Sequence, residues 1–219
     1  FEDAPAIAFR DVTVRTPTGD SLLRDLSFRV EEGQSLLICG HNGAGKSSII
    51  RCLCGLWPVP KGKICRPGGG AIVEENARLR GEMYYLPQKP CNVLGSLADQ
   101  LTYPERAEMS EAELRRWLRY ADLEYLADRK VGADSPSHAQ GGGDDETDWE
   151  HLLSLGEQQA LSILRLLYHR PRFAVLDECT SAVGKVLERR LFEVAKELGI
   201  SCISITHRPA LREHHERML

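Results

Sequence analysis

Residues 40–47 read Gly40-His41-Asn42-Gly43-Ala44-Gly45-Lys46-Ser47 and fit the pattern G-x-x-x-x-G-K-[ST] without a substitution. A short apolar run at 35–39 precedes this stretch and predicts a buried strand, and residues 48–54 follow it with the pattern of a helix. In a strand–loop–helix unit the glycines let backbone N–H groups point at phosphate oxygens, and the helix N-terminus adds partial positive charge. The alternative is a chance glycine-rich turn, and both flanks favour a nucleotide-phosphate loop instead.

The residues of this loop would share the binding of the nucleotide. Lys46 would reach the β- and γ-phosphates, and the Ser47 hydroxyl would coordinate Mg²⁺. The rest of the expected nucleotide-binding set is Gly40, His41, Asn42, Gly43, Ala44, Gly45 and Ser48. The loop alone predicts that a nucleotide is bound and leaves its use open.

Composition restricts the remaining possibilities. The 219 residues suit one domain, or a domain with an inserted subdomain, and a hydrophobic fraction of 42% is enough for a sizeable core. The formal net charge of −4 gives no electrostatic case for a nucleic-acid partner. No apolar run approaches the length needed to cross a bilayer. The chain starts at Phe1 without a methionine or a visible signal peptide, so we expect it to be part of a longer protein.

The seven cysteines predict buried free thiols in a reducing compartment, because their number is odd and most lie in apolar strands or helices. Metal binding by Cys52 and Cys54 is the alternative. On a helix, however, residues two apart point in different directions, and no second cysteine or histidine pair completes a zinc site.

Periodic patterns along the chain predict an α/β fold. Strand-like runs occur at residues 6–16, 22–30, 35–39, 64–65, 83–86, 173–176 and 201–205. Helical patterns occur at residues 48–54, 94–100, 110–127, 154–170 and 185–198, and a last helix or turn begins at Pro209 and extends to about Met218. Residues 68–80 and 133–147 are polar or glycine-rich and predict surface loops. Three apolar strands alternate with helices and end in polar residues, as in a parallel sheet with its ligand at the carboxyl ends of the strands.

Polar residues at strand ends are the candidates for chemistry on the nucleotide. Asp177 ends an apolar strand and would hold Mg²⁺, whereas Glu178 points differently and would act as general base or position the attacking water. Two solvated acids are the alternative, which the phosphate loop in the same chain makes less favoured. His207, after the last strand, would bond the γ-phosphate, although a lone histidine is more often structural. Gln88, after a strand and a proline, would reach the Mg²⁺ or the water.

A further anion site is predicted at the start of an apolar helix. Ser154 and Glu157 form the S-x-x-E pattern of a capping box, and Leu155 and Gly156 lie between them. Such a helix start offers backbone N–H groups and a hydroxyl to an anion. The alternative is that the box only caps the helix, and physical reasoning alone does not say which phosphate it would meet.

With these pieces in order, the chain resembles the nucleotide-binding domain of ABC transporters over nearly its whole length. The resemblance identifies 40–47 as the Walker A loop, Gln88 as the Q-loop glutamine, 153–157 as the signature and 173–177 as Walker B. It makes Glu178 the catalytic glutamate and His207 the switch histidine.

The resemblance is greater still to subfamily D, the peroxisomal fatty-acyl-CoA half-transporters. Cys179 and Val183 support it, because most ABC cassettes look like Asp-Glu-Ala-Thr-Ser-Ala-Leu-Asp at this point. The other supporting stretches are residues 55–58, 86–90, 95–100, 103–104, 148–149, 168–171 and 204–209.

The resemblance implies a P-loop NTPase core with a mixed, mainly parallel sheet, an antiparallel β subdomain and an inserted α-helical subdomain at about 92–150. The whole of 1–219 would be an ABC ATP-binding domain that hydrolyses ATP with Mg²⁺. Two such domains, identical or different, would face each other head to tail, each signature meeting the ATP held by the other. Transmembrane helices upstream would complete a half-transporter, with this domain on the cytosolic face of a membrane. The resemblance to subfamily D implies the peroxisomal membrane, and another organelle or the plasma membrane is the alternative.

Several departures from the family pattern bear on these expectations. Leu155 stands where the general signature has glycine, Ala160 where an arginine is usual, and Gly184 where most cassettes have the D-loop aspartate. No aromatic residue lies near Thr16, where many cassettes stack the adenine on a tyrosine, so adenine would rest on an aliphatic or proline surface.

Three other functions compete with a fatty-acyl-CoA transporter. One is a transporter ATPase for another substrate, such as a cobalamin-like molecule or a peptide. Another is a non-hydrolysing regulatory nucleotide-binding module. The third is a soluble mechanochemical ATPase acting on DNA or ribosomes, which would need a coiled-coil insertion or a basic surface, and the sequence has neither.

Overall fold

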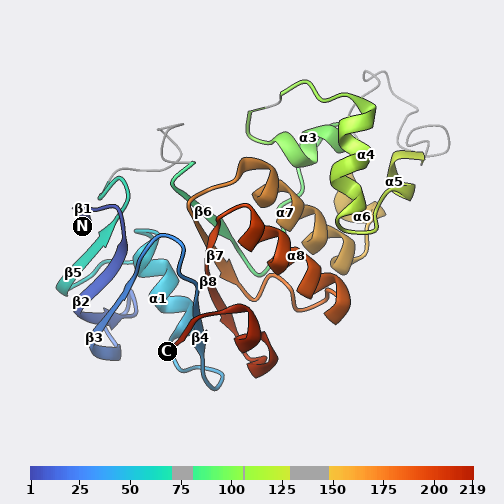
Figure 1. The fold of residues 1–219 in the computed structure, drawn as a ribbon. Coiled ribbons are helices and arrows are strands. Elements are labelled where there is room, and N and C mark those ends of the chain that lie inside the picture. The colour runs from blue at the N-terminus through green and yellow to red at the C-terminus, as the bar shows by residue number, and fades with distance from the viewer. Residues whose placement is uncertain (71–80, 106, 129–147) are drawn as a thin grey trace. The chain divides into compact units, whose positions relative to one another are not determined.

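The computed structural model describes residues 1–70, 81–105, 107–128 and 148–219 (Figure 1). The predicted loop 133–147 and most of the predicted loop 68–80 lie outside these residues. The chain forms two compact units. The first comprises Phe1–Gln88, Arg170–Glu178 and Ala195–Leu219, and the second comprises Lys89–His169 and Cys179–Val194. The predicted helical segment 92–150 falls within the second unit.

The antiparallel part of the first unit is a four-stranded sheet with the order β1-β5-β2-β3. It contains β1 (Glu2–Asp3), β2 (Ile7–Arg15), β3 (Ser21–Val30) and β5 (Lys61–Arg66). Strand β2 pairs antiparallel with both β3 and β5, whereas β1 pairs parallel with β5. The strands predicted at 6–16 and 22–30 are present as β2 and β3. Strand β5 is longer than the predicted residues 64–65, because its polar first half also pairs with β2.

The other sheet of the first unit is parallel throughout, with the order β6-β7-β8-β4-β9. Its strands are β4 (Leu36–Cys39), β6 (Met83–Leu86), β7 (Phe173–Asp177), β8 (Ser201–Thr206) and β9 (Arg217–Met218). Every residue of β7 and β8 is buried, as expected for parallel strands covered on both faces. Parallel pairing brings the carboxyl ends of β7, β8 and β4 to one edge of the sheet.

The end of the chain differs from the prediction. The region from Pro209 to Met218 was expected to hold a helix or turn, but only η3 (Pro209–His214) is helical, of the 3₁₀ type, and a short parallel strand follows. The Arg217 N–H donates to Ser35 O at 3.1 Å, and the Leu219 N–H donates to Leu37 O at 2.8 Å. This strand depends on β4, which is distant in the sequence, so local periodicity gives no sign of it.

Helix α1 (Lys46–Leu53) contacts β2 in one sheet and β7 in the other. Its apolar residues join the core formed by both sheets. The central members of that core, all less than 2% exposed, are Ile7, Phe9, Val12, Ile50, Leu53, Phe173, Val175, Ile203 and Ile205. Burying each such side chain contributes about 1.5–3 kcal/mol, so α1 and the phosphate loop before it are held firmly in place.

The second unit is helical. It contains α3 (Leu97–Thr102), α4 (Glu111–Arg119), α5 (Tyr125–Asp128), α6 (Trp149–Leu152), α7 (Leu155–His169) and most of α8 (Lys185–Glu197). Helix α7 is the centre of this unit, because α3 and α4 both pack on it and its residues from Gln158 to Leu167 are all buried. This confirms the prediction of a helix that is apolar on nearly every side. No helix among the described residues is long and apolar enough to cross a membrane.

The helix predicted at 110–127 is interrupted. Ser110 caps its first turn, since the Glu113 N–H donates to Ser110 Oγ at 3.3 Å, but α4 ends at Arg119 and α5 begins only at Tyr125. Asp122 adopts a left-handed backbone with φ 56°, and the Leu123 N–H donates back to Leu118 O at 3.0 Å. The apolar residues keep helical spacing across this break, and the sequence pattern therefore conceals it.

All seven cysteines are free thiols, and four of them are buried. Burial raises the pKa of Cys202 to about 12 and that of Cys54 to about 11. Thiolates form rarely at such values, so these side chains behave as small apolar residues.

Candidate functional site

The phosphate loop connects β4 to α1 at the edge of the parallel sheet. Gly45 occupies the N-cap position of α1 with φ 88°, and Gly43 also has a positive φ of 79°. A side chain at either position would be strained, which explains the two glycines. Within the loop, the Ala44 N–H donates to His41 O at 3.2 Å. The predicted strand–loop–helix context is therefore present.

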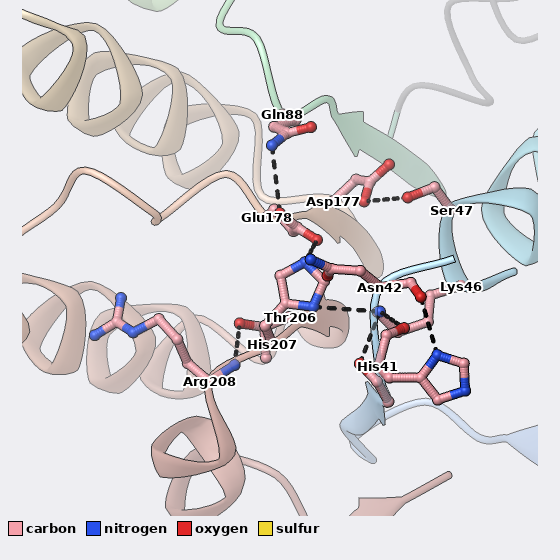
Figure 2. Close-up of polar contacts among 11 residues, drawn as sticks. His41, Asn42, Lys46, Ser47, Gln88, Asp177, Glu178, Thr206, His207 and Arg208 are labelled. Atoms are coloured by element: carbon pink, nitrogen blue, oxygen red, sulfur yellow. Dashed lines mark hydrogen bonds and ion pairs between the residues drawn. The ribbon is translucent and has the colours of Figure 1, made fainter. Parts of the chain in front are cut away.

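Lys46 lies at the centre of this loop and is only 7% exposed. Its ammonium donates to Gly40 O at 2.8 Å and to His41 O at 2.9 Å. The same nitrogen lies 3.3 Å from Nδ1 of His207, at the end of β8 (Figure 2). The loop is thus wrapped around a positive charge, and that charge also reaches the neighbouring strand.

Ser47 and Asp177 are brought together across the sheet edge. The Ser47 hydroxyl donates to Asp177 Oδ1 at 3.1 Å. Asp177 is 7% exposed, and burial raises its carboxyl pKa, while the Ser47 hydrogen bond acts in the opposite direction. Burial, together with the charge of Asp177, also raises the pKa of the nearby Tyr85 to about 12. A buried carboxylate beside a hydroxyl is a hard oxygen donor set, which fits Mg²⁺.

Glu178 follows β7 directly and turns away from Asp177. Its backbone is left-handed, with φ 50°, and its N–H donates to Ile205 O at 3.0 Å. Figure 2 shows Asp177 directed at Ser47, whereas Glu178 lies between the side chains of Gln88 and His207. The prediction that the two adjacent acids point differently is confirmed.

The two carboxylate oxygens of Glu178 have different partners. Nε2 of His207 lies 2.6 Å from Oε1, and Nε2 of Gln88 donates to Oε2 at 3.3 Å. Because Lys46 donates to the other ring nitrogen of His207, we infer the tautomer in which Nε2 carries the proton and donates it to Glu178. A continuous chain of polar contacts thus runs from Lys46 through His207 to Glu178.

The remaining predicted residues of the loop contribute less to this chain of contacts. His41 and Asn42 are exposed, and Nδ1 of His41 lies 2.9 Å from Asn42 O. Ser48 is buried at the start of α1. The first unit therefore brings together six predicted side chains, namely Lys46, Ser47, Gln88, Asp177, Glu178 and His207.

The predicted signature lies in the second unit, where its capping box forms. The Ser154 N–H donates to the Glu157 carboxylate at 2.6 Å, and the Glu157 N–H donates to Ser154 Oγ at 3.4 Å. The Ser154 hydroxyl and the Tyr125 hydroxyl also donate to this carboxylate. The sequence left open whether the Ser154 hydroxyl serves an anion or the box only caps the helix, and in this structure the hydroxyl is engaged by Glu157. Leu155 is half exposed beside it.

Sequence reasoning missed the contacts that hold the loop after Glu178. Gln159 is 1% exposed and bonds to Ser181 and Ala182 of that loop. The available signal was a glutamine inside a helix predicted to be buried on nearly every side, because a buried amide needs partners.

The shifted pKa of Asp177 predicts that its charge opposes folding. Its folded-state value lies above the unfolded value of about 3.9, so ionisation is disfavoured in the folded protein. Asp177→Asn should therefore raise the melting temperature at pH 7, and the gain should shrink as the pH falls through the folded-state pKa toward 3.9, as followed by calorimetry.

Asp25→Asn is the matched control with the opposite sign. Lys61 lies 2.7 Å from Asp25 Oδ1 and lowers the carboxyl pKa, so removal of this charge should leave stability at pH 7 unchanged or slightly reduced. A lower melting temperature for Asp177→Asn at pH 7 would contradict the burial argument.

Comparisons with known proteins identify the family of this chain. The sequence profile of the family described as "ABC transporter" matches residues 23–181. The chain is 45% identical to ABC transporter D family member 1 of Arabidopsis thaliana, covering 100% of this chain and 16% of that protein. It is 39% identical to ATP-binding cassette sub-family D member 3 of Homo sapiens, covering 97% of this chain and 30% of that protein. It is 42% identical to sub-family D member 1 of Drosophila melanogaster, covering 100% and 29%.

A solved structure shares the fold. A bacterial Atm1-family ABC exporter, solved with ATP bound, matches with a TM-score of 0.78 and 23% identity over 100% of this chain and 37% of that chain. The chain thus spans less than a third of the length of the curated relatives described above. The profile match and the level of identity together show that this chain belongs to the ABC transporter family, with subfamily D members among its relatives.

Proposed function

We propose that this chain is an Mg²⁺-dependent ATP-hydrolysing domain that powers transport across a membrane. The observation that carries the proposal is the chain of contacts from Lys46 through His207 to Glu178 at the carboxyl edge of the parallel sheet. This edge is where α/β sheets hold ligands. A module that only binds nucleotide needs the loop and its lysine, but it has no need of a carboxylate held at both oxygens.

Lys46, Ser47 and Asp177 would hold the nucleotide and its metal. The Lys46 ammonium lies inside the loop, where it would exchange backbone carbonyls for β- and γ-phosphate oxygens. The Ser47 hydroxyl and the Asp177 carboxylate would hold Mg²⁺, which supplies positive charge against the phosphates when bound. Coordination would also relieve the buried Asp177 of an unbalanced negative charge.

Glu178 would activate the attacking water. The water oxygen would bond to the γ-phosphorus as one of its O–H bonds breaks, the proton would pass to the Glu178 carboxylate, and ADP would leave with the former bridging oxygen. His207 and Gln88 would hold the carboxylate in the orientation that this step requires. Gln88 would have to give up its hydrogen bond to Glu178 to reach the metal or the water. Its contacts would therefore differ between the nucleotide-free and the nucleotide-bound domain.

The second half of the site would come from another copy of the domain. Ser154, Leu155 and Gly156 would meet the γ-phosphate held by the partner's phosphate loop, as the family resemblance implies. The Glu157 carboxylate now engages the Ser154 hydroxyl, so an arriving phosphate would compete with it. ATP would then close the dimer, and hydrolysis would allow it to separate.

The proposal for the transported substrate rests on similarity to subfamily D relatives. The relatives described above are subfamily D proteins more than three times as long as this chain, so we propose membrane helices elsewhere in the same polypeptide. Within this proposal the protein is a half-transporter on the peroxisomal membrane, with the ATPase domain facing the cytosol, and its substrate is a fatty acid or fatty acyl-CoA.

Replacement of Glu178 tests the hydrolytic role. Glu178→Gln should lower the ATPase turnover of the 219-residue chain by about 10²–10⁴-fold, because it removes the proton acceptor, and should leave Mg²⁺-ATP binding unchanged. Turnover is measured by phosphate release at high protein concentration, and binding by calorimetry.

Glu32→Gln is the control. It removes a carboxylate whose partner, Arg172, precedes the amino end of β7, at the opposite end of that strand from Glu178. Its turnover should equal that of the parent. A parent chain that turns over no faster than Glu178→Gln would show that the hydrolase proposal is wrong.

The substrate proposal predicts stimulation by one class of lipid thioester. In liposomes, long-chain fatty acyl-CoA should raise the ATPase rate of the complete polypeptide severalfold, whereas cobalamin and short peptides should leave it at the basal level. Stimulation by cobalamin or peptide alone would contradict the acyl-CoA proposal while leaving the hydrolytic site intact.

A further inference from the structure

Gln159 connects helix α7 to the loop that follows Glu178, within the second unit. Its Nε2 donates to Ser181 Oγ at 3.0 Å, and its Oε1 accepts the Ala182 N–H at 2.8 Å. The side chain is 1% exposed, whereas Ser181 and Ala182 are exposed. The buried amide of Gln159 therefore holds two loop residues that are themselves exposed to solvent.

A second contact joins the same two segments. A Cβ added to Gly156 would lie 2.8 Å from Ala182 O, which is closer than real Cβ atoms come to other heavy atoms. Ala182 is thus held at its N–H by Gln159 and packed at its carbonyl against the first turn of α7. Gly156, predicted only as a phosphate contact, has a packing reason to be glycine.

The loop is also fixed at its far end. The Val183 N–H donates to Thr180 O at 3.1 Å, and the Glu188 N–H donates to Gly184 O at 2.8 Å, which starts α8. Gly184 itself has open space around its Cβ position. The contacts from α7 to Ser181 and Ala182 therefore fix the middle of the loop, between Thr180 and the start of α8.

We propose that Gln159 is a positioning residue that joins the loop 179–184 to the N-terminal end of α7, so that both segments meet the partner copy as one rigid surface. The inference rests on the proposed function, because it assumes an ATP-closed dimer. In that dimer Ser154 faces the nucleotide, and the loop begins one residue after Glu178. Fixing the loop would cut the entropy lost on dimerisation, as preorganised surfaces do.

The test uses the 219-residue chain carrying Glu178→Gln, so that ATP-closed dimers persist. Gln159→Met keeps the volume and removes both hydrogen bonds, and Ser181→Ala removes one of them from an exposed position where folding is not at risk. Gln158→Met is the matched control. Gln158 is an adjacent buried glutamine that bonds to Glu150 O and Leu153 O at 2.9 Å, and to Asn92, instead of the loop.

Gln159→Met should make the Ala182 amide exchange hydrogen about tenfold faster, consistent with the loss of two hydrogen bonds. It should raise the ATP concentration that gives half-maximal dimer, measured by light scattering, by a similar factor, and Ser181→Ala should have a smaller effect of the same sign. The control should leave Ala182 exchange unchanged. Nucleotide affinity of the monomer should be unchanged in every variant, which a general loss of folding would not allow.

Each contrary result has a distinct meaning. Unchanged Ala182 exchange in Gln159→Met would overturn the positioning role. Faster exchange with normal ATP-driven dimerisation would overturn the inference and leave the proposed function standing. A parent chain that forms no dimer with ATP would overturn the proposed function, and the inferred role in the dimer would be lost with it.

Discussion

The contact between the Lys46 ammonium and His207 is the interaction on which the rest of the site depends. Lys46 holds the phosphate loop through two backbone carbonyls, and His207 takes its other hydrogen bond to Glu178. The residue that would bind phosphate and the residue that would activate water are therefore linked through one imidazole ring. A phosphate that draws the Lys46 ammonium toward itself would alter the surroundings of His207, which in turn contacts Glu178.

The parallel sheet makes this linkage possible. Register pairs Cys39 with Thr206 and Asp177 with Ile205, so β4, β8 and β7 end at nearly the same height. The last residue of each strand and the residue that follows it therefore lie at one edge of the sheet, beside the phosphate loop. Both faces of these strands are covered, which makes slippage costly, because it would displace buried side chains. The positions of the reactive groups thus follow from core packing.

Elements with strong local sequence signals could be predicted, whereas elements that depend on contacts between distant parts of the chain could not. The phosphate loop, β7 and β8 could be predicted because glycine spacing and short apolar runs act within a few residues. Strand β9 could not, since its hydrogen bonds go to a strand far away in the sequence. The same limit applies to the site. Its acids and histidine could be placed at strand ends, and the Ser154–Glu157 capping box follows from spacing within one helical turn. The anchoring of a loop by Gln159 depends instead on tertiary contacts.

The most direct test of the link from Lys46 to Glu178 is the tautomer of the His207 ring, measured by ¹⁵N NMR on the nucleotide-free chain. We expect the tautomer in which Nε2 carries the proton and directs it at Glu178, while Nδ1 accepts from Lys46. In Lys46→Ala this preference should weaken. A proton on Nδ1 in the parent chain would contradict the link between the phosphate loop and the proposed catalytic carboxylate.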